Sequence, residues 1–250
     1  MKVTLITVCL NSAATIRDTL ESVRAQDHAD IEYLVIDGAS TDSTLDIVRS
    51  YGDVVTHVLS ERDRGMYDSM NKGLRLATGE VVGFVHSDDM LASPTVISAI
   101  ARVFADHAIE CVYGDIDMVD PVDTTRVVRH WRSGPHRPGR LSRGWYPPHV
   151  TLYIRKSVLD EVGPFDERYR IAADMDHMVR LFEVRGVRSV HLPQVLVRMR
   201  AGGASNRSLR NIWRANIETW RSLRSHGFRV GPWFIVFKLM RKIPQLFMRA

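Results

Sequence analysis

Cysteine is scarce in this chain, whose 250 residues include only Cys9 and Cys111. Two cysteines are too few for a disulfide-stapled scaffold or for a zinc site built on thiolates. Both lie in apolar runs typical of strands, so we expect buried free thiols and a reducing cytosol, with one disulfide between neighbouring strands as the alternative. Long apolar runs are also missing, because no stretch reaches the roughly 18 residues of a membrane-spanning helix. The first residues lack the pattern of a signal peptide.

Two glycine-rich motifs are absent as well. The sequence has neither G-x-G-x-x-G after its first expected strand nor G-x-x-x-x-G-K-[ST] anywhere. Their absence argues against a dinucleotide-dependent oxidoreductase and against a P-loop NTPase. The composition, 45% hydrophobic and 25% charged, is that of an ordinary globular protein.

Basic charge is concentrated towards the C-terminus. Residues 205–250 carry ten lysines and arginines and one acid, Glu218, whereas residues 1–204 carry 24 basic and 28 acidic residues. The formal net charge of +5 therefore belongs to the C-terminal segment, and the rest of the chain is mildly acidic. Such asymmetry indicates a segment that meets an anionic surface.

We expect residues 206–250 to form a basic amphipathic helical tail, with helical segments at 208–226 and 233–248. Aromatic and aliphatic residues alternate there with lysine and arginine, which favours the interface of an anionic membrane. The alternative is a helix that docks on the preceding domain. Nucleic acid is not an expected partner, because the remainder of the chain is acidic and carries no nucleic-acid-binding motif.

Strand and helix patterns alternate through the first hundred residues. This alternation predicts a parallel, doubly wound α/β sheet with helices on both faces. Ser93 and Pro94 match the favoured start of a helix. The expected strands span 2–9, 32–36, 54–59 and 80–85, and the expected helices span 14–26, 43–51, 66–77 and 94–107.

The pattern changes after residue 110. Strands are expected at 111–113, 126–131, 151–154 and 195–200, and a helix at 174–185. The long segment 132–148 is rich in glycine, proline, arginine and histidine, and its length indicates function or disorder rather than a simple connection.

Polar residues follow the ends of the first four expected strands. They are Asn11, Asp37, the loop 61–65 and the run Ser87-Asp88-Asp89. Because ligands of parallel sheets bind beyond the carboxyl ends of the strands, we expect all four to converge on one rim.

Acidic residues at two of these strand ends have specific alternatives. Asp37 directly follows an apolar run and suits a hydrogen-bond acceptor for a nucleobase, although loop and cap chemistry explains its neighbours equally well. Asp88 and Asp89 repel each other unless a cation lies between them, which favours Mg²⁺ or Mn²⁺ bound together with substrate phosphate. The alternative is a solvated pair at a helix start.

The stretch 61–73 is dense in polar groups for a helix start. Arg64 and Lys72 suit phosphate, to which charge-assisted hydrogen bonds are strong. The alternative is a solvated helix face.

Taken together, these motifs resemble the family 2 glycosyltransferases of the GT-A fold over residues 2–205. Val35-Ile36-Asp37-Gly38-Ala39-Ser40-Thr41-Asp42 resembles the family's D-[DG]-x-S-T-D loop. Gly65-Met66-Tyr67-Asp68-Ser69-Met70-Asn71-Lys72-Gly73 resembles the G-[IV]-Y-D-A-M-N-K-G run of bacterial members that build exopolysaccharide, O-antigen or glycolipid glycans. The resemblance implies a Rossmann-like mixed sheet flanked by helices, with a nucleotide-sugar-binding half at 1–110 and an acceptor-binding half at 111–205.

The resemblance also implies a set of donor-site residues. Asp88 would ligate a divalent metal, Mn²⁺ or Mg²⁺, bound to the donor diphosphate. His86 replaces the first acid of the family's D-x-D motif and would face the ribose or simply pack. The expected nucleotide-sugar contacts are Thr7, Asn11, Asp37, Ser40, Arg64, Asp68, Asn71, Lys72, His86, Ser87 and Asp89.

The expected catalytic base is Asp174. The family places an E-D pair at the start of a helix, and here Ala173-Asp174 fills that place after a matching Gly163-Pro164-Phe165-Asp166-Glu167 lead-in. Asp176 is the second candidate for the base. Contacts with the acceptor or the diphosphate are expected from His149, Asp176, Arg180, Gly202 and Gly203, although His149 can equally hold a loop and the glycines can simply make a turn.

The function implied is inverting sugar transfer from a nucleotide-diphosphate donor, with UDP favoured and GDP open. The acceptor would be a hydroxyl of a glycan or of a polyprenyl-diphosphate-linked or other lipid-linked molecule in bacterial surface polysaccharide or glycolipid synthesis. Such a protein would work in the cytoplasm, peripherally on the inner face of the cell membrane. The alternative is a non-catalytic nucleotide-sugar-binding or scaffold subunit, which His86 and Ala173 leave open.

Overall fold

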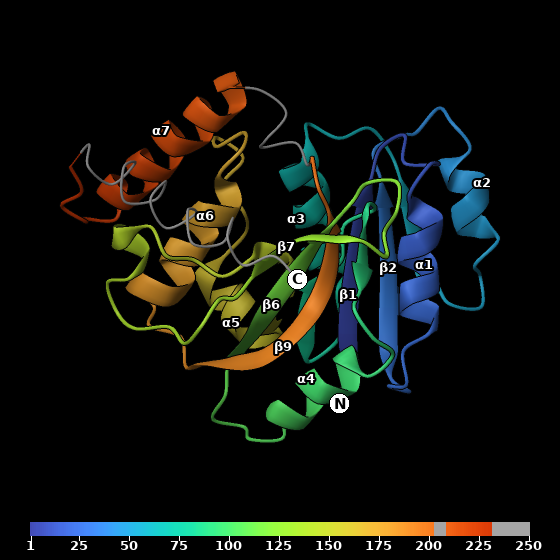
Figure 1. Cartoon of the computed structure of the whole chain (residues 1–250), viewed down its shortest axis with the longest axis horizontal. Coiled ribbons are helices and arrows are strands. Elements are labelled where there is room, and N and C mark those ends of the chain that lie inside the picture. The colour runs from blue at the N-terminus through green and yellow to red at the C-terminus, as the bar shows by residue number, and fades with distance from the viewer. Residues whose placement is uncertain (203–208, 232–250) are drawn as a thin grey trace.

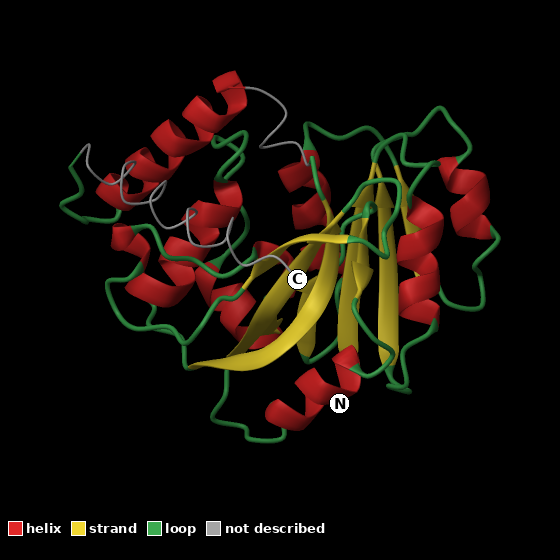
Figure 2. Cartoon of the chain, in the orientation of Figure 1, coloured by secondary structure: helices red, strands yellow, loops and turns green. Residues whose placement is uncertain are grey.

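The computed structural model describes residues 1–202 and 209–231 and is built on a nine-stranded mixed sheet (Figures 1 and 2). Eight strands follow the order β3-β2-β1-β4-β8-β6-β9-β5, and β7 pairs with β6. Helices cover both faces of this sheet. The expected α/β fold with a mixed sheet flanked by helices is confirmed.

The N-terminal half is the parallel part of the sheet. Its strands are β1 (Val3–Cys9), β2 (Ile31–Asp37), β3 (His57–Ser60) and β4 (Val81–Phe84). Successive residues of β1 point to opposite faces, as the period of a strand requires. Leu5 packs with the core under α1 (Ile16–Arg24) and α2 (Thr44–Arg49), and Ile6 packs with the core under α3 (Met66–Leu76).

Antiparallel pairing begins in the second half. The strand β8 (Tyr153–Arg155) pairs antiparallel with both β4 and β6 (Cys111–Val119), and β7 (Val127–Trp131) pairs antiparallel with β6. The strand β9 (Ser189–Arg200) runs parallel to β6 and pairs antiparallel with β5 (Asp89–Leu91). The helices of this half are α4 (Val96–Val103), α5 (Lys156–Val162), α6 (Ala173–Met178) and α7 (Leu209–Ser225).

Several expected boundaries were wrong. The helix expected to start at Ser93 and Pro94 instead has Thr95 at its N-cap position. The short strand β5 was not expected, and it begins at Asp89, directly within the acidic run. The helix expected at 174–185 continues after Met178 as a π-helix, Val179–Val184. The strand expected at 195–200 is the C-terminal half of the 12-residue β9, which pairs with β6 near both of its ends and with β5 at residues 197–199.

The long loop at 132–148 is ordered by buried polar contacts. Glu183 accepts hydrogen bonds from the backbone N–H groups of Gly139 and Leu141, and Asp115 accepts one from that of Ser133. Within it Leu141–Arg143 forms a 3₁₀ turn. The loop therefore holds one conformation against the domain.

The helix α7 lies beside α6 (Figure 1) and is part of the folded body. Leu223 is fully buried, and the Trp220 indole N–H donates to the carbonyl oxygen of Val230. The first part of the expected tail thus follows the docking alternative, whereas the segment expected at 233–248 lies outside the described residues.

Two expectations from the scarce residues can be checked. Cys9 and Cys111 are buried free thiols in β1 and β6. None of the helices within residues 1–202 and 209–231 is both long and apolar enough to cross a bilayer.

Candidate active site

A cleft of about 850 Å³ opens beyond the carboxyl ends of the central strands. Its walls come from the loops after β1, β3 and β4, from the start of α6 and from α7. Of the residues expected to form the site, the cleft brings together Asn11, His86, Ser87, Asp88, Asp89, His149 and Asp174.

Other expected residues do not line this cleft. They are Thr7, Asp37, Ser40, Arg64, Asp68, Asn71, Lys72, Asp176, Arg180 and Gly202, and Gly203 lies outside the described residues. Gly202 follows β9 at a φ of 102° in an exposed turn. Thr7 is fully buried, and its hydroxyl contacts the Val85 carbonyl oxygen and the Tyr33 hydroxyl.

Asp37 is 0% exposed, and its carboxylate is occupied within the fold. The Ser40 backbone N–H and the Ser60 hydroxyl donate to Oδ2, while the Ser40 hydroxyl and the Cys9 thiol donate to Oδ1. A carboxylate offers about four lone-pair sites. In this structure the Asp37 carboxylate therefore uses its lone pairs to hold the loop after β2 and its neighbours.

Asn11 joins the loops after β1 and β2. Its φ of 50° is in the left-handed region, which asparagine tolerates better than most residues. Its side-chain oxygen accepts from the Thr41 N–H at 2.9 Å, and its own N–H donates to the Ser40 hydroxyl at 2.8 Å.

The carboxylate that does reach the cleft at this end is Asp63, which the sequence reasoning missed. A Cβ atom added to Gly38 would lie 2.4 Å from Asp63 Oδ2, so Asp63 occupies the space that a side chain at position 38 would fill. The Gly65 N–H and the Ser69 hydroxyl each donate to one oxygen of Asp63. Each oxygen of the Asp63 carboxylate keeps a lone pair that can accept a hydrogen bond from a ligand. The sequence signal that could have pointed to Asp63 is Gly38, because only a residue without a side chain leaves room for this carboxylate.

The polar run at the start of α3 mostly serves the fold. Lys72 Nζ lies 3.0 Å from Glu61 Oε1 and 3.4 Å from Asp68 Oδ2. Burial opposes the charge of Lys72, but the hydrogen bond to Glu61 and the charge of Asp68 outweigh it and raise the pKa of the lysine. Arg64 pairs with Asp68 and Glu167. These cations are neutralised by acids and are not directed at the cleft.

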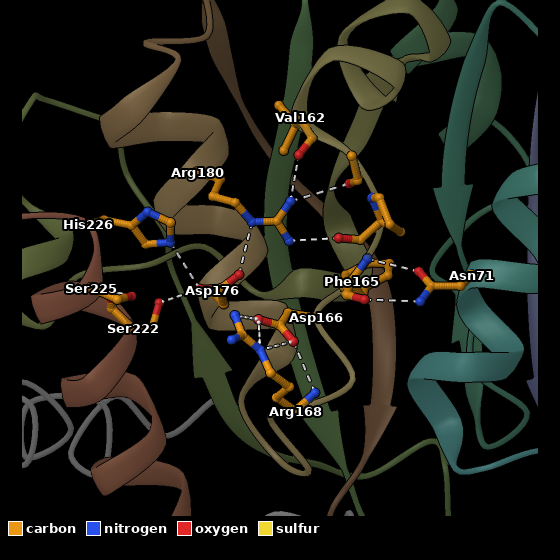
Figure 3. Close-up of polar contacts among 12 residues, drawn as sticks. Asn71, Val162, Phe165, Asp166, Arg168, Asp176, Arg180, Ser222, Ser225 and His226 are labelled. Carbon is orange, nitrogen blue, oxygen red and sulfur yellow. Dashed lines mark hydrogen bonds and ion pairs between the residues drawn. The ribbon is translucent and has the colours of Figure 1, made fainter.

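Asn71 is likewise a structural residue here. Its amide makes two hydrogen bonds with the backbone of Phe165, one to the carbonyl oxygen at 3.0 Å and one from the N–H at 2.8 Å (Figure 3). This pair ties α3 to the Gly163–Glu167 lead-in ahead of α6.

Asp88 and Asp89 occupy different environments. Asp89 is 2% exposed at the start of β5, where burial and the charge of Asp88 raise the pKa of its carboxyl well above the usual value. Asp88 is half-buried and lines the cleft, and its carbonyl oxygen accepts from Arg200 at 2.8 Å. Among the residues that the structure describes, no three His, Cys, Asp or Glu side chains cluster as metal ligands.

This donor set suits a divalent cation that is also held by a ligand. Mg²⁺ and related ions usually bind through one or two carboxylates and complete their coordination with substrate phosphates and water. Asp88, facing the cleft beside a second carboxyl, supplies what such an ion needs from the protein. The chain therefore fits Mn²⁺ or Mg²⁺ only in company with an anionic ligand.

Two histidines face the cleft in their neutral form. The rings of His86 and His149 stack at 6.3 Å between centroids. Burial lowers the pKa of His86, although the charge of Asp88 opposes this shift, and burial together with His86 and His177 lowers the pKa of His149 well below its usual value. Neutral rings at neutral pH can pack against a sugar or donate one hydrogen bond each.

Asp174 stands in the first turn of α6, half-buried at the wall of the cleft. The Tyr67 hydroxyl lies 3.2 Å from Asp174 Oδ1 and 2.8 Å from the Ile171 carbonyl oxygen. From α7, Glu218 Oε2 accepts the N–H groups of Ile171 and Ala172 at 2.8 and 3.0 Å. The backbone that carries Asp174 is thus fixed from both α3 and α7.

Asp176 points away from the cleft into the interior between α6 and α7 (Figure 3). Its carboxylate pairs with Arg180 at 2.9 Å and accepts from the Ser222 hydroxyl at 2.8 Å. Arg180 in turn donates to the carbonyl oxygens of Val162 and Pro164. Asp176, the second candidate for the base, and Arg180 therefore join helices rather than meet a ligand.

Another part of the cleft contains residues that the sequence reasoning did not single out. It combines apolar side chains with a half-buried arginine and with a wall supplied by α7. These residues are Met118, Arg129, Trp131, Tyr146, Asn211, Ile212, Ala215, Asn216 and Thr219.

Solved structures share this architecture. TarS of S. aureus in complex with UDP-GlcNAc superposes with a TM-score of 0.67 at 20% identity, covering 98% of this chain and 73% of that one. The mannosyltransferase PcManGT of Pyrobaculum calidifontis, in complex with GDP-Man and Mn²⁺, gives a TM-score of 0.65 at 19% identity, covering 100% and 76%. The fold is that of the GT-A glycosyltransferases.

Sequence comparison adds the family. The sequence model described as Glycosyl transferase family 2 matches residues 4–162, and the chain belongs to this family. A PGL/p-HBAD biosynthesis glycosyltransferase of Mycobacterium tuberculosis is 32% identical over 177 residues, which are 69% of this chain and 66% of that relative. The match thus leaves about a third of that relative's length uncovered.

Proposed function

We propose that this chain transfers a sugar from a nucleotide-diphosphate donor to a hydroxyl of a glycan or lipid-linked acceptor, with inversion at the anomeric carbon. The observation that carries this proposal is the meeting of Asp88 and Asp174, from opposite halves of the fold, in one cleft. One suits a metal-bound diphosphate, and the other suits a proton acceptor for the attacking hydroxyl.

On the donor side, Asp63 would accept a hydrogen bond from a base N–H, in place of Asp37. Uracil and guanine both offer such a donor, and we favour UDP. Asp88 would hold Mn²⁺ or Mg²⁺, and the bound ion would offset negative charge on the departing nucleoside diphosphate. The related folds in complex with UDP-GlcNAc, or with GDP-Man and Mn²⁺, support a donor of this class.

On the acceptor side, Asp174 would take the proton from the acceptor hydroxyl while the hydroxyl oxygen forms its bond to the anomeric carbon. The bond from that carbon to the donor phosphate breaks on the opposite face. The hydrogen bond from Tyr67 keeps the carboxylate in place. The apolar wall of Trp131, Tyr146 and Ile212 favours a lipid-linked or aromatic acceptor.

We also propose a peripheral site of action on the inner face of a bacterial cell membrane, in surface polysaccharide or glycolipid synthesis. The ten basic residues in 205–250 support attraction to anionic lipids. Flotation of the full chain with phosphatidylglycerol vesicles tests this proposal, with phosphatidylcholine vesicles as the control. Equal flotation with both would refute the electrostatic contact.

The catalytic proposal is tested by Asp174→Asn, with Asp176→Asn as the matched control on the same helix. Both substitutions remove one charge, but only Asp174 faces the cleft. We expect Asp174→Asn to abolish transfer and leave UDP-sugar binding nearly unchanged, measured by product formation and calorimetry. Asp176→Asn should lower thermal stability and retain turnover. If Asp176→Asn abolishes transfer and Asp174→Asn retains it, Asp176 is the base instead.

The rival function, a non-catalytic nucleotide-sugar-binding subunit, predicts a different result. A competent transferase slowly hydrolyses its donor in water and releases free nucleoside diphosphate, whereas a binding module does not. Wild-type protein that binds UDP-sugars without any hydrolysis or transfer would favour the rival.

A further inference from the structure

Arg129 is a half-buried cation without a counter-ion among the described residues. It lies on β7 opposite Met118 of β6, and both line the cleft. Its Nε is buried, and no acceptor within residues 1–202 and 209–231 lies within hydrogen-bond distance of it. The sequence around it, Val127-Val128-Arg129-His130-Trp131, reads as an ordinary edge strand.

The protein gives Arg129 little compensation for its burial. The centre of its guanidinium lies 5.9 Å from the Trp131 ring centroid, which is a weak cation–π contact at that distance. Withdrawal of an unpaired charge from water is unfavourable even where the side chain is only partly buried. Burial also lowers the pKa of Arg129, as expected for a cation without an anion beside it. The surroundings are therefore incomplete unless a ligand supplies the negative charge.

The position of Arg129 relates it to the acceptor. Tyr146 also lines the cleft, where burial raises the pKa of its hydroxyl, the charge of Asp174 adds to that shift and the charge of Arg129 opposes it. The Trp131 and Tyr146 rings make an edge-to-face contact at 5.6 Å beside it. Asp88, the proposed metal ligand, comes instead from the loop after β4, in the other half of the domain.

We propose that Arg129 binds an oxyanion of the acceptor, a phosphate or a carboxylate, next to the hydroxyl that receives the sugar. A guanidinium presents two parallel N–H groups that match two oxygens of such a group. The aromatic wall beside it covers an apolar portion of the same molecule. The acceptor is thus an amphiphile with its anion close to the reacting hydroxyl. This inference rests on the proposed function, since it assigns the acceptor of that site.

The test uses the full chain saturated with UDP and Mn²⁺, and phenyl phosphate, benzoate and benzyl alcohol as probes. The variants are Arg129→Lys and Arg129→Gln, with Arg126→Gln as a control at an exposed arginine just ahead of the same strand. Binding is followed by calorimetry and by the ¹⁵N resonance of the Arg129 Nε–H. This resonance is assigned as the arginine signal that is missing from the spectrum of Arg129→Lys.

We expect phenyl phosphate or benzoate to shift the Arg129 resonance, and benzyl alcohol to leave it unchanged. The probe that binds more tightly distinguishes phosphate from carboxylate. Arg129→Gln should weaken that binding by about tenfold or more and leave UDP affinity and donor hydrolysis unchanged. It should melt no lower than wild type, because it removes an unpaired and half-buried charge; if it fails to fold, Arg129→Lys gives the same comparison.

Three results would overturn the inference. One is equal probe binding by wild type and Arg129→Gln, and another is the absence of anion binding to the UDP-saturated wild type. The third is an Arg129→Gln variant that binds UDP more weakly and the probes as well as wild type does, which would mean that Arg129 binds the donor diphosphate and not the acceptor. A wild-type protein that binds no sugar nucleotide would refute the proposed function instead. In that case the shift of the Arg129 Nε–H resonance on addition of phenyl phosphate or benzoate to the UDP-free protein would still test the anion site.

Discussion

Glu218→Gln tests whether α7 belongs to the catalytic machinery. The Glu218 side chain is buried, with 5% exposure, and accepts the N–H groups of Ile171 and Ala172 and the Nε–H of Arg214 at 2.8–3.0 Å. Glutamine keeps the shape and one acceptor oxygen. It removes the charge and turns an N–H₂ group towards donors.

The magnitude follows from these three bonds. Hydrogen bonds to a charged group contribute about 1.5–3 kcal/mol each, and neutral ones about 0.5–1.5 kcal/mol. If the substitution weakens two of these hydrogen bonds and removes the third, the free energy of unfolding should fall by about 2–4 kcal/mol. For a chain of this size that corresponds to a fall in Tm of about 4–16 °C. Turnover should fall as well, because the same two N–H groups fix the start of the helix that carries Asp174.

The effect should depend on pH. Burial opposes the Glu218 charge, but the hydrogen bonds from Ile171 and Arg214 outweigh it and hold its pKa below the usual 4.5. The carboxylate therefore contributes fully above about pH 4.5, and its contribution is lost as the pH falls through the lower folded-state pKa. The gap between wild type and Glu218→Gln should be largest at neutral pH and shrink in acid.

Thermal unfolding followed by circular dichroism at several pH values measures this gap. The control is Glu161→Gln, which removes an exposed partner of Arg185 and should cost no more than about 1 kcal/mol. A Glu218→Gln protein that melts with wild type at pH 7 and turns over normally would show that α7 does not position the base.

Three further outcomes are expected. Asp88→Ala should weaken Mn²⁺-dependent UDP binding by at least about tenfold in calorimetry and leave the thermal unfolding midpoint of the ligand-free protein nearly unchanged. If Mn²⁺ still strengthens UDP binding as much as in wild type, Asp88 is not a metal ligand. Gly38→Ala should displace the Asp63 carboxylate and lower UDP affinity by about tenfold, whereas Gly52→Ala, whose new Cβ meets nothing closer than 3.7 Å, should not. Burial and the charge of Arg180 lower the pKa of His177 to about 3, so wild type should lose stability to urea as the pH falls from about 6.5, and His177→Leu should flatten that slope.

The parallel half of the sheet could be predicted from the sequence because its signal is local. Each strand is a short β-branched run, each helix repeats its apolar residues every three to four positions, and ligands gather where such strands end. Asn11 and Asp88 were located in this way, whereas Asp174 was located through the resemblance of its motif to that of the family, and all three line the cleft.

What could not be predicted depends on contacts between distant segments. Asp37 and Asp63 are both acids at strand ends, and only the fold shows that four donors surround the first while the second faces the cleft. Asp174 and Asp176 are two residues apart on one helix and so point in different directions. The position of α7 determines which of the two lines the cleft, because α7 packs against Asp176 and leaves Asp174 at the cleft wall. The partial burial of Arg129 depended in the same way on distant residues such as Tyr146, which lines the same cleft.

The dependence of α6 on Glu218 has a consequence for the order in which the molecule is assembled. The partner of the Ile171 N–H lies 47 residues further along the chain. During synthesis, the loops after β1, β3 and β4 leave the ribosome long before the segment that fixes the start of α6. A growing chain can therefore form the loops that carry Asn11 and Asp88 before α7 holds Asp174 in place, and under the proposed function activity would appear only when α7 has folded.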